Sequence, residues 1–157
     1  MYSIGEQVVY PMHGAGTIVR IEEKEILGVI RSYYILEMSY GKMQVMVPVD
    51  GAEATGLRPV SDPSVVPSVL ETLAAESTPM DENWNRRLRD NAEKIHTGDM
   101  CQVAGVIRNL ARIERVKKLS SGEKKQLQTA KQILVSELIL VKAISEQEAL
   151  DLIDSTI

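Results

Sequence analysis

The periodicity of the apolar residues changes near residue 60, and this change constrains the fold more than any other feature of the sequence. Before it, apolar and polar residues alternate in short runs, which is the pattern of half-buried strands. After it, apolar residues recur at three- and four-residue spacing, which is the pattern of amphipathic helices. The sequence therefore predicts an α+β chain with two domains, residues 1–60 and residues 61–157. A chain of 157 residues gives each domain a modest core.

The first domain is expected to contain four or five short strands. Pro11 ends the first β-prone run and Pro48 ends the last, while residues 13–16 are typical of a turn. Strands of this length with short connections favour a small closed or nearly closed barrel, because closure removes exposed sheet edges. The expected strands are Gln7–Tyr10, Thr17–Glu22, Arg31–Met38 and Met43–Val47.

The second domain is expected to be all-α, with about five helices. Its helix starts can be predicted from residues whose side chains accept hydrogen bonds from the first free backbone N–H groups. The expected starts, in chain order after a first helix near Pro67, are Thr78 followed by Pro79, Asp99, the capping box of Ser120 with Glu123, and the capping box of Ser145 with Glu148.

The composition, 44% apolar and 25% charged, is that of a globular protein. No run of 18 apolar residues is present, which argues against a membrane span. Cys101 is the only cysteine, so no intramolecular disulfide can form, and this suits a reducing compartment. The N-terminus has no basic segment followed by an apolar one, so no signal peptide is expected. The expected location is therefore the cytoplasm.

The net charge of −4 conceals a basic block. Residues 83–131 carry 12 Lys and Arg against 5 Asp and Glu, and acidic segments flank them. Because salt screens charges beyond about 8–10 Å, a local basic surface can still attract phosphate groups. Charge alone leaves two interpretations open, a nucleic-acid contact and an ordinary solvated face.

The sequence offers little to catalysis. His13 and His96 lie far apart in the chain, and Cys101 has no metal-ligand spacing around it. The segment Gly14-Ala15-Gly16 is too short for a phosphate-binding loop and stands between strands, so a hairpin turn is the better interpretation. We therefore expect no enzyme, no cofactor, no metal and no small-molecule substrate.

Within the basic block, Arg108, Arg112 and Arg115 are spaced to share one helix face. Lys124 and Lys131 share a stripe of the following helix, with Lys125 adjacent. These residues could contact phosphates, or they could form a solvated face with i,i+4 ion pairs. The sequence gives the two interpretations equal weight.

Trp84 is the only tryptophan and stands in the segment Asn83-Trp84-Asn85-Arg86-Arg87-Leu88-Arg89. On a helical projection it falls near Leu88, which favours a buried anchor, because large apolar side chains are usually buried. The alternative is a flat ring held among arginines, which could stack on an unpaired base. From composition and spacing the buried anchor is favoured.

Four segments together resemble the CarD/CdnL family of bacterial transcription regulators. The first resembles the opening of the family, which is shared with the polymerase-interaction domain of transcription-repair coupling factors, and the others resemble a barrel strand, the family's W-x-R-R motif and its last long helices. The segments, which extend over nearly the whole chain, are Ile4–Gly16, Val45–Pro48, Asn83–Arg87, and Leu119–Lys124 with Ala130–Leu138.

This resemblance implies a Tudor/SH3-like barrel that docks on the β subunit of RNA polymerase, and a helical domain that contacts promoter DNA. In the family a tryptophan wedges into the minor groove at the upstream edge of the transcription bubble and stabilises the open complex. The resemblance therefore favours the wedge for Trp84. It also implies DNA contacts at Arg86, Arg87, Arg89, Lys124 and Lys125, and polymerase contacts at Lys24, Val45, Met46, Val47 and Pro48.

Met46 departs from the family pattern, because some relatives have an arginine there. A methionine replaces a charge-assisted contact by a flexible apolar one, although docking on an edge strand can rest on main-chain hydrogen bonds. Two other functions remain open. One is a protein–protein adaptor on the polymerase with Trp84 buried, and the other is a nucleic-acid-binding protein that acts without the polymerase.

Overall fold

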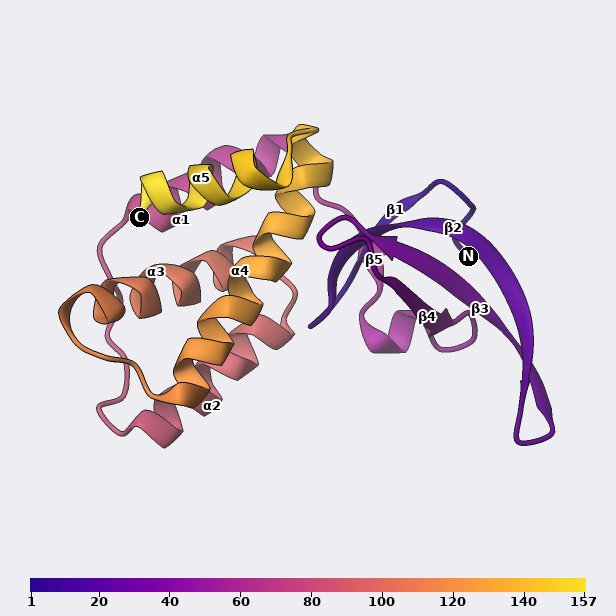
Figure 1. Cartoon of the computed structure of the whole chain (residues 1–157), viewed down its shortest axis with the longest axis horizontal. Helices are drawn as coiled ribbons and strands as arrows, with labels where there is room; N and C mark the ends of the chain where they lie inside the picture. Colours follow the sequence, from indigo (N-terminus) through magenta and orange to yellow (C-terminus); the bar gives the residue numbers. More distant parts are fainter.

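The computed structural model describes residues 1–157 and places a sheet of five strands, called the sheet domain below, beside a group of five helices, called the helical domain below, as Figure 1 shows. All five strands belong to one antiparallel sheet with the order β4-β3-β2-β1-β5. The predicted α+β order of strands followed by helices is confirmed. The strands are β1 (Gln7–Tyr10), β2 (Gly14–Ile26), β3 (Val29–Met38), β4 (Gln44–Pro48) and β5 (Arg58–Pro59).

The expected barrel is not confirmed, because the sheet has two open edges. β4 pairs only with β3, and β5 pairs only with β1. β5 is two residues long, and a 3-10 turn over Glu53–Thr55 stands between β4 and β5 in the chain. A strand this short covers only Val8 and Val9 of β1. Because β4 pairs with a strand on one side only, its outer edge is available to another chain.

Strands β2 and β3 are longer than the sequence predicted, and their outer halves leave the sheet. β1 pairs with β2 only as far as Thr17, and β4 pairs with β3 only from Tyr33 onward. Residues 23–32, called the ribbon below, therefore pair only with each other. A register shift between Ile18 and Arg20 marks a bulge in β2 shortly before the ribbon begins. Figure 1 shows the ribbon as a two-stranded projection at lower right.

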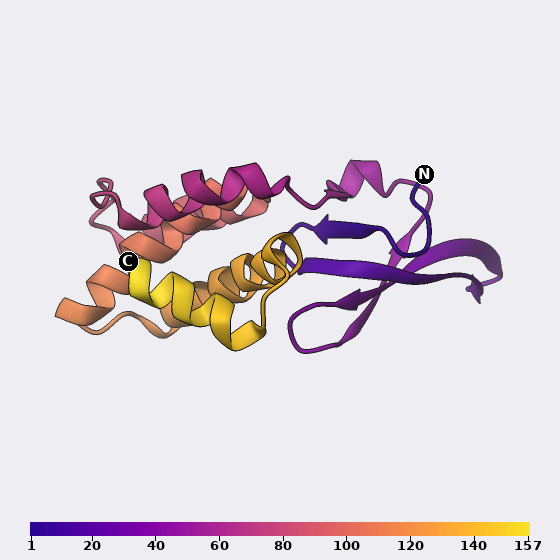
Figure 2. The same cartoon turned by 90° about the horizontal axis from the view of Figure 1, so that it is seen from above.

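Five helices form the second domain and pack in layers beside one end of the sheet (Figures 1 and 2). Their number agrees with the prediction. None of them has the length and apolar character required for a membrane crossing. A 3-10 turn over Pro63–Val65 leads into the helices, which are α1 (Val66–Ala74), α2 (Trp84–His96), α3 (Met100–Val116), α4 (Ser121–Lys142) and α5 (Glu146–Thr156).

Three of the predicted N-cap residues are confirmed. Asp99 accepts hydrogen bonds from the first turn of α3, and Ser145 forms the complete capping box with Glu148 at α5. Ser120 caps α4 by accepting from the Glu123 backbone N–H at 3.2 Å. The box there is incomplete, because the Glu123 carboxylate binds the Ser120 hydroxyl and another side chain in place of the backbone.

The prediction that Thr78 caps the second helix is wrong. α2 begins six residues later, at Trp84, and the Asn83 side chain accepts from the N–H groups of Asn85 and Arg86. Thr78 instead pairs with Asn109 of α3 through two hydrogen bonds, of 3.2 and 2.8 Å. This tertiary contact satisfies the polar groups of Thr78 without a helix.

The two domains have cores of different size. Nineteen buried apolar residues form the core of the helical domain, with Leu73, Ile107, Leu110 and Leu134 at its centre. Eight form the core beneath the sheet, including the fully buried Tyr34. The helical domain therefore has the larger share of hydrophobic stabilisation, and the thin sheet core ends before the ribbon.

Candidate nucleic-acid and polymerase surfaces

Trp84 is the first residue of α2, and 49% of its surface is exposed. The Asn83 cap sets this position, because it fixes where the helix begins. The prediction of a buried anchor is therefore wrong for Trp84. Leu88, one turn later, is partly buried and holds the helix against its neighbours.

The three arginines after Trp84 divide into two kinds. Arg86 and Arg89 are exposed, and neither takes part in a side-chain ion pair. Arg87 is only 9% exposed and forms a two-bonded ion pair with Glu123, at 2.7 and 2.8 Å. A helix places successive residues about 100° apart, so Arg87 is directed inward while Arg86 and Arg89 are directed toward solvent.

The buried pair of Arg87 with Glu123 joins α2 to the first turn of α4. Hydrogen bonding to Arg87, assisted by the guanidinium charge, holds the pKa of the Glu123 carboxyl below its ordinary value despite burial. The same hydrogen bond raises the pKa of Arg87. Arg87 has its partner inside the protein, so its guanidinium is not free for the DNA contact that the resemblance implied.

Lys124 and Lys125 are exposed at the beginning of α4. The first turn of α4 lies beside α2, where the Gln126 side-chain amide donates to the Leu88 carbonyl at 2.9 Å. The N-terminal turns of two helices are thus neighbours, and helix N-termini carry partial positive charge. No hydrogen bond or ion pair links Trp84 to either lysine, so what the structure brings together is the two helix starts.

Two of the three arginines on one face of α3 donate hydrogen bonds to backbone carbonyls of the protein itself. Arg108 is 4% exposed and donates to the Thr72 carbonyl at 2.7 Å. Arg112 donates to the carbonyls of Leu73, Ala74 and Ala75 at 3.3, 3.5 and 2.7 Å. These are carbonyls that the end of α1 leaves without helical partners. Burial, followed by the charge of Arg112, lowers the pKa of Arg108. Of the three, only Arg115 remains exposed.

The residues with implied polymerase contacts lie on β4 and on the ribbon. Met46 is exposed, Val45 and Pro48 are partly buried, and Val47 is in the sheet core with no exposed surface. The hydrogen bonds of Met43 and Val49 to β3 fix the alternation of the pairing, so the backbone groups of Val47 face Tyr34 of β3, and the open edge of β4 offers those of Met46 instead. Lys24 is exposed on the ribbon, with its ammonium 3.7 Å from Glu22.

The tip of the ribbon is an exposed apolar surface that the sequence analysis did not identify. Ile26, Leu27, Val29 and Ile30 are 46%, 98%, 50% and 68% exposed around the turn at Gly28. Their composition predicts buried strand residues, and only the lack of flanking strands exposes them. An exposed apolar cluster of this kind is typical of a protein-binding surface.

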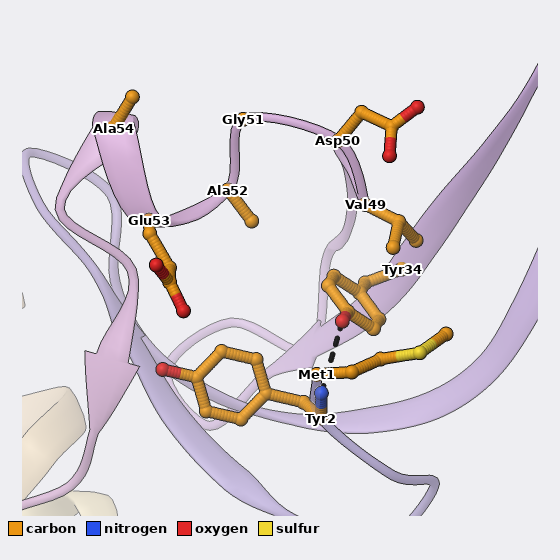
Figure 3. A pocket seen from close by; sticks show the side chains of 9 residues that line it. All are labelled: Met1, Tyr2, Tyr34, Val49, Asp50, Gly51, Ala52, Glu53 and Ala54. Carbon is orange, nitrogen blue, oxygen red and sulfur yellow. Dashed lines mark hydrogen bonds between the residues drawn. The ribbon is translucent and has the colours of Figure 1, made fainter.

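A pocket of about 530 Å³ lies beside Tyr34 of β3, between the N-terminal segment and the turn after β4 (Figure 3). The Tyr2 backbone N–H donates to the Tyr34 hydroxyl at 2.9 Å, and the Tyr2 hydroxyl donates to the Leu57 carbonyl at 3.1 Å. Burial, assisted by the charge of Glu53, raises the pKa of Tyr2. The two hydrogen bonds fasten the N-terminal segment across the sheet.

His13 lies in the turn between β1 and β2, and its ring stacks on Tyr10 with centroids 4.4 Å apart. Burial lowers the pKa of His13. No group of three or more His, Cys, Asp or Glu side chains is arranged to hold a metal ion.

The fold and its exposed surfaces describe a two-domain protein suited to macromolecular partners, and comparison with known proteins gives its class. The family described as "CarD-like/TRCF RID domain" matches residues 2–61, and "CarD, C-terminal domain" matches residues 68–154. The protein described as "Putative transcription factor YdeB", from Bacillus subtilis (strain 168), is 38% identical over 148 residues, which are 94% of this chain and 97% of that protein. The chain belongs to the CarD family, and is a transcription regulator that interacts with RNA polymerase.

Proposed function

We propose that this regulator docks on the β subunit of RNA polymerase through its sheet domain and sets Trp84 against promoter DNA at the upstream edge of the bubble. There it stabilises the open complex. The observation that carries the proposal is the exposed indole at the start of α2, with Arg86 and Arg89 free beside it. A flat apolar ring can insert at an unstacked base step while cations hold the phosphates.

The proposed docking surface combines the open edge of β4 with the ribbon. An edge strand offers unpaired N–H and C=O groups that another strand can bind. Met46 and the ribbon tip add apolar area beside that edge, and Lys24 adds a charge. Fully burying an aliphatic side chain is worth about 1.5–3 kcal/mol, so the tip can supply much of the affinity where relatives use an arginine in place of Met46.

Tethering makes a weak DNA contact sufficient. Once the sheet domain is bound, the helical domain meets the promoter at an effective concentration of about millimolar. The chain alone should bind DNA weakly, with an affinity that falls steeply as salt rises, because few phosphates are contacted. The wedge stabilises the open state only if Trp84 interacts better with the melted junction than with duplex.

Site-specific crosslinking tests the contact. The photoreactive residue p-benzoylphenylalanine replaces Trp84 in one variant and Val116 in a control, because Val116 is also apolar and exposed but lies at the end of α3. We expect polymerase–promoter complexes to crosslink position 84 to DNA at the upstream edge of the bubble, with little crosslinking from position 116. Equal DNA crosslinking at both positions would contradict a specific contact by Trp84.

The adaptor alternative keeps the polymerase but dispenses with the DNA contact. It expected Trp84 to be buried, and the half-exposed indole favours the wedge instead. In the crosslinking experiment an adaptor would link position 84 to a polypeptide and not to DNA.

A further inference from the structure

The contacts between the two domains are buried and polar, and the first of them centres on Ser136 in α4. Its hydroxyl accepts from the Ala15 backbone N–H at 2.8 Å and donates to the Ile133 carbonyl at 2.6 Å. The Ser39 hydroxyl donates to the Ser136 carbonyl at 2.6 Å. A methyl group on Gly14 would lie 2.6 Å from the Ser136 hydroxyl oxygen. α4 therefore lies against β2 at a separation that tolerates no added atom.

The next residue of α4 makes the second contact. Glu137 is 3% exposed and accepts two hydrogen bonds from Arg58 of β5, at 3.0 and 2.9 Å. It also accepts from the Ser61 backbone N–H at 2.9 Å, and Arg58 donates to the Gly98 carbonyl at 2.6 Å. One carboxylate thus joins the last strand, the connection between the domains and the helical domain. Bonds of this number and direction permit one relative orientation.

The other end of α4 holds the helix that carries Trp84. Glu123 and Arg87 form the buried ion pair described above, three residues from Trp84 in α2. Glu123 and Glu137 are 14 residues apart on one uninterrupted helix, a distance of about 21 Å along its axis. A helix that long, packed in the larger core, acts as a stiff spacer between its two anchored ends.

We infer that Ser136 and Glu137 are positioning residues, which lock the two domains into one rigid body so that α4 sets where Trp84 stands relative to the polymerase-docking surface. This inference rests on the proposed function. A flexible link would let the tethered indole sample many orientations, and this spread would lower the effective concentration of the indole at the DNA junction. The locked domains remove that loss before binding.

Three variants test the inference in the full-length chain. Ser136→Ala with Glu137→Gln weakens both contacts from the helical side. Arg58→Gln weakens the second contact from the sheet side and leaves the sequence of the helical domain unchanged, so it guards against misfolding of that domain. Asp154→Asn is the matched control, because it removes the ion pair that Asp154 of α5 forms with Lys131 of α4 at 3.0 Å, away from the junction.

Two measurements are made on each variant. Spin labels on Gln7→Cys and Glu93→Cys, both exposed positions, report the distance between the domains in a Cys101→Ala background. The lifetime of the open complex is measured at saturating factor, with polymerase affinity determined separately. We expect the junction variants to broaden a narrow distance distribution and to shorten the lifetime by about tenfold, without loss of polymerase affinity. Asp154→Asn should resemble the wild type.

The outcomes separate the two proposals. If the junction variants keep a narrow distance, or broaden it while retaining the full lifetime, the positioning role is overturned even though Trp84→Ala still shortens the lifetime. If Trp84→Ala retains the full lifetime, the wedge itself has failed. The positioning role, stated for Trp84, then fails with it, and the distance data show only whether the domains are locked.

Discussion

The two domains expose different chemistry. The sheet domain projects an aliphatic ribbon tip and an unpaired strand edge, whereas the helical domain exposes one indole with free arginines beside it. Aliphatic groups and strand edges suit a protein surface, and an aromatic ring among cations suits nucleic acid. The contrast supports a division of labour in which one domain binds the polymerase and the other contacts DNA.

The domains also use buried charge differently. The sheet core is apolar, but the helical domain contains a buried ion pair, Arg87 with Glu123, and the junction contains a partly buried one, Arg58 with Glu137. Buried pairs add little net stability over apolar packing, but removing one partner is costly. Their geometry fixes orientation, which is what a domain that must present a single side chain requires. The following predictions would break or sharpen this comparison.

The largest effect is expected from Glu123→Ala, which leaves Arg87 buried without its partner. The free energy of unfolding should fall by about 3–5 kcal/mol. Glu114→Ala, at an exposed position of α3, should change it by less than about 0.5 kcal/mol. Urea unfolding of the full chain measures both. A loss below about 1 kcal/mol for Glu123→Ala would show that the pair does not hold α2 in place.

The ribbon should contribute to polymerase affinity and not to the stability of the fold. Ile26→Ser with Leu27→Ser removes exposed apolar groups, so stability should be unchanged while polymerase affinity falls by about tenfold or more. Ile4→Ser is the control, because Ile4 is 63% exposed but lies before β1, outside the ribbon. Binding of labelled chain to polymerase measures the effect. Equal losses from both variants would remove the ribbon from the docking surface.

Arg86 and Arg89 should act through phosphates alone. Arg89→Ala is expected to lower the slope of log affinity against log salt by about one for tethered DNA binding, without changing stability. Lys142→Ala, at the far end of α4, should leave the slope unchanged. The measurement is affinity of the polymerase-bound factor for promoter DNA over a salt series. A slope that Arg89→Ala leaves intact argues for a solvated arginine.

A smaller effect concerns pH. The pKa of Glu123 is lowered by folding, so its stabilising contribution is present above its unfolded pKa of about 4.3 and disappears as the pH falls through the lower folded value. The stability difference between wild type and Glu123→Gln should therefore shrink as the pH falls below about 4. The ribbon variant should track the wild type at every pH. Unfolding curves from pH 7 to pH 3 test both statements.

The order and number of elements could be predicted from the sequence because periodicity and local capping carry that information. Asp99 and Ser145 form their caps with groups within three residues, so their roles are visible in the chain itself. Thr78 has an equally suitable side chain for capping, but it forms a hydrogen bond with Asn109, 31 residues away, and does not cap a helix. Capping rules use only residues that are close in the chain, so they cannot predict that a tertiary hydrogen bond will form in place of a helix start.

The candidate site, too, could be predicted only in part from the sequence. The resemblance selected Arg86, Arg87 and Arg89 together, but only the structure separates the buried one from the exposed pair. Arg112 carries the same charge, yet it completes the end of α1. The ribbon tip was missed because Ile26 and Ile30 have the composition of buried strand residues. Exposure depends on which strands flank them, and that is a property of the whole sheet.

The lifetime of the open complex, measured with no factor, with the wild-type chain and with Trp84→Ala, tests the central claim most directly. Trp84→Ala must remain folded and bound to the polymerase, and its exposed position makes both expected. The account predicts that the wild type prolongs the lifetime and that Trp84→Ala returns it close to the value without factor. A Trp84→Ala chain that prolongs the lifetime as well as the wild type would contradict it.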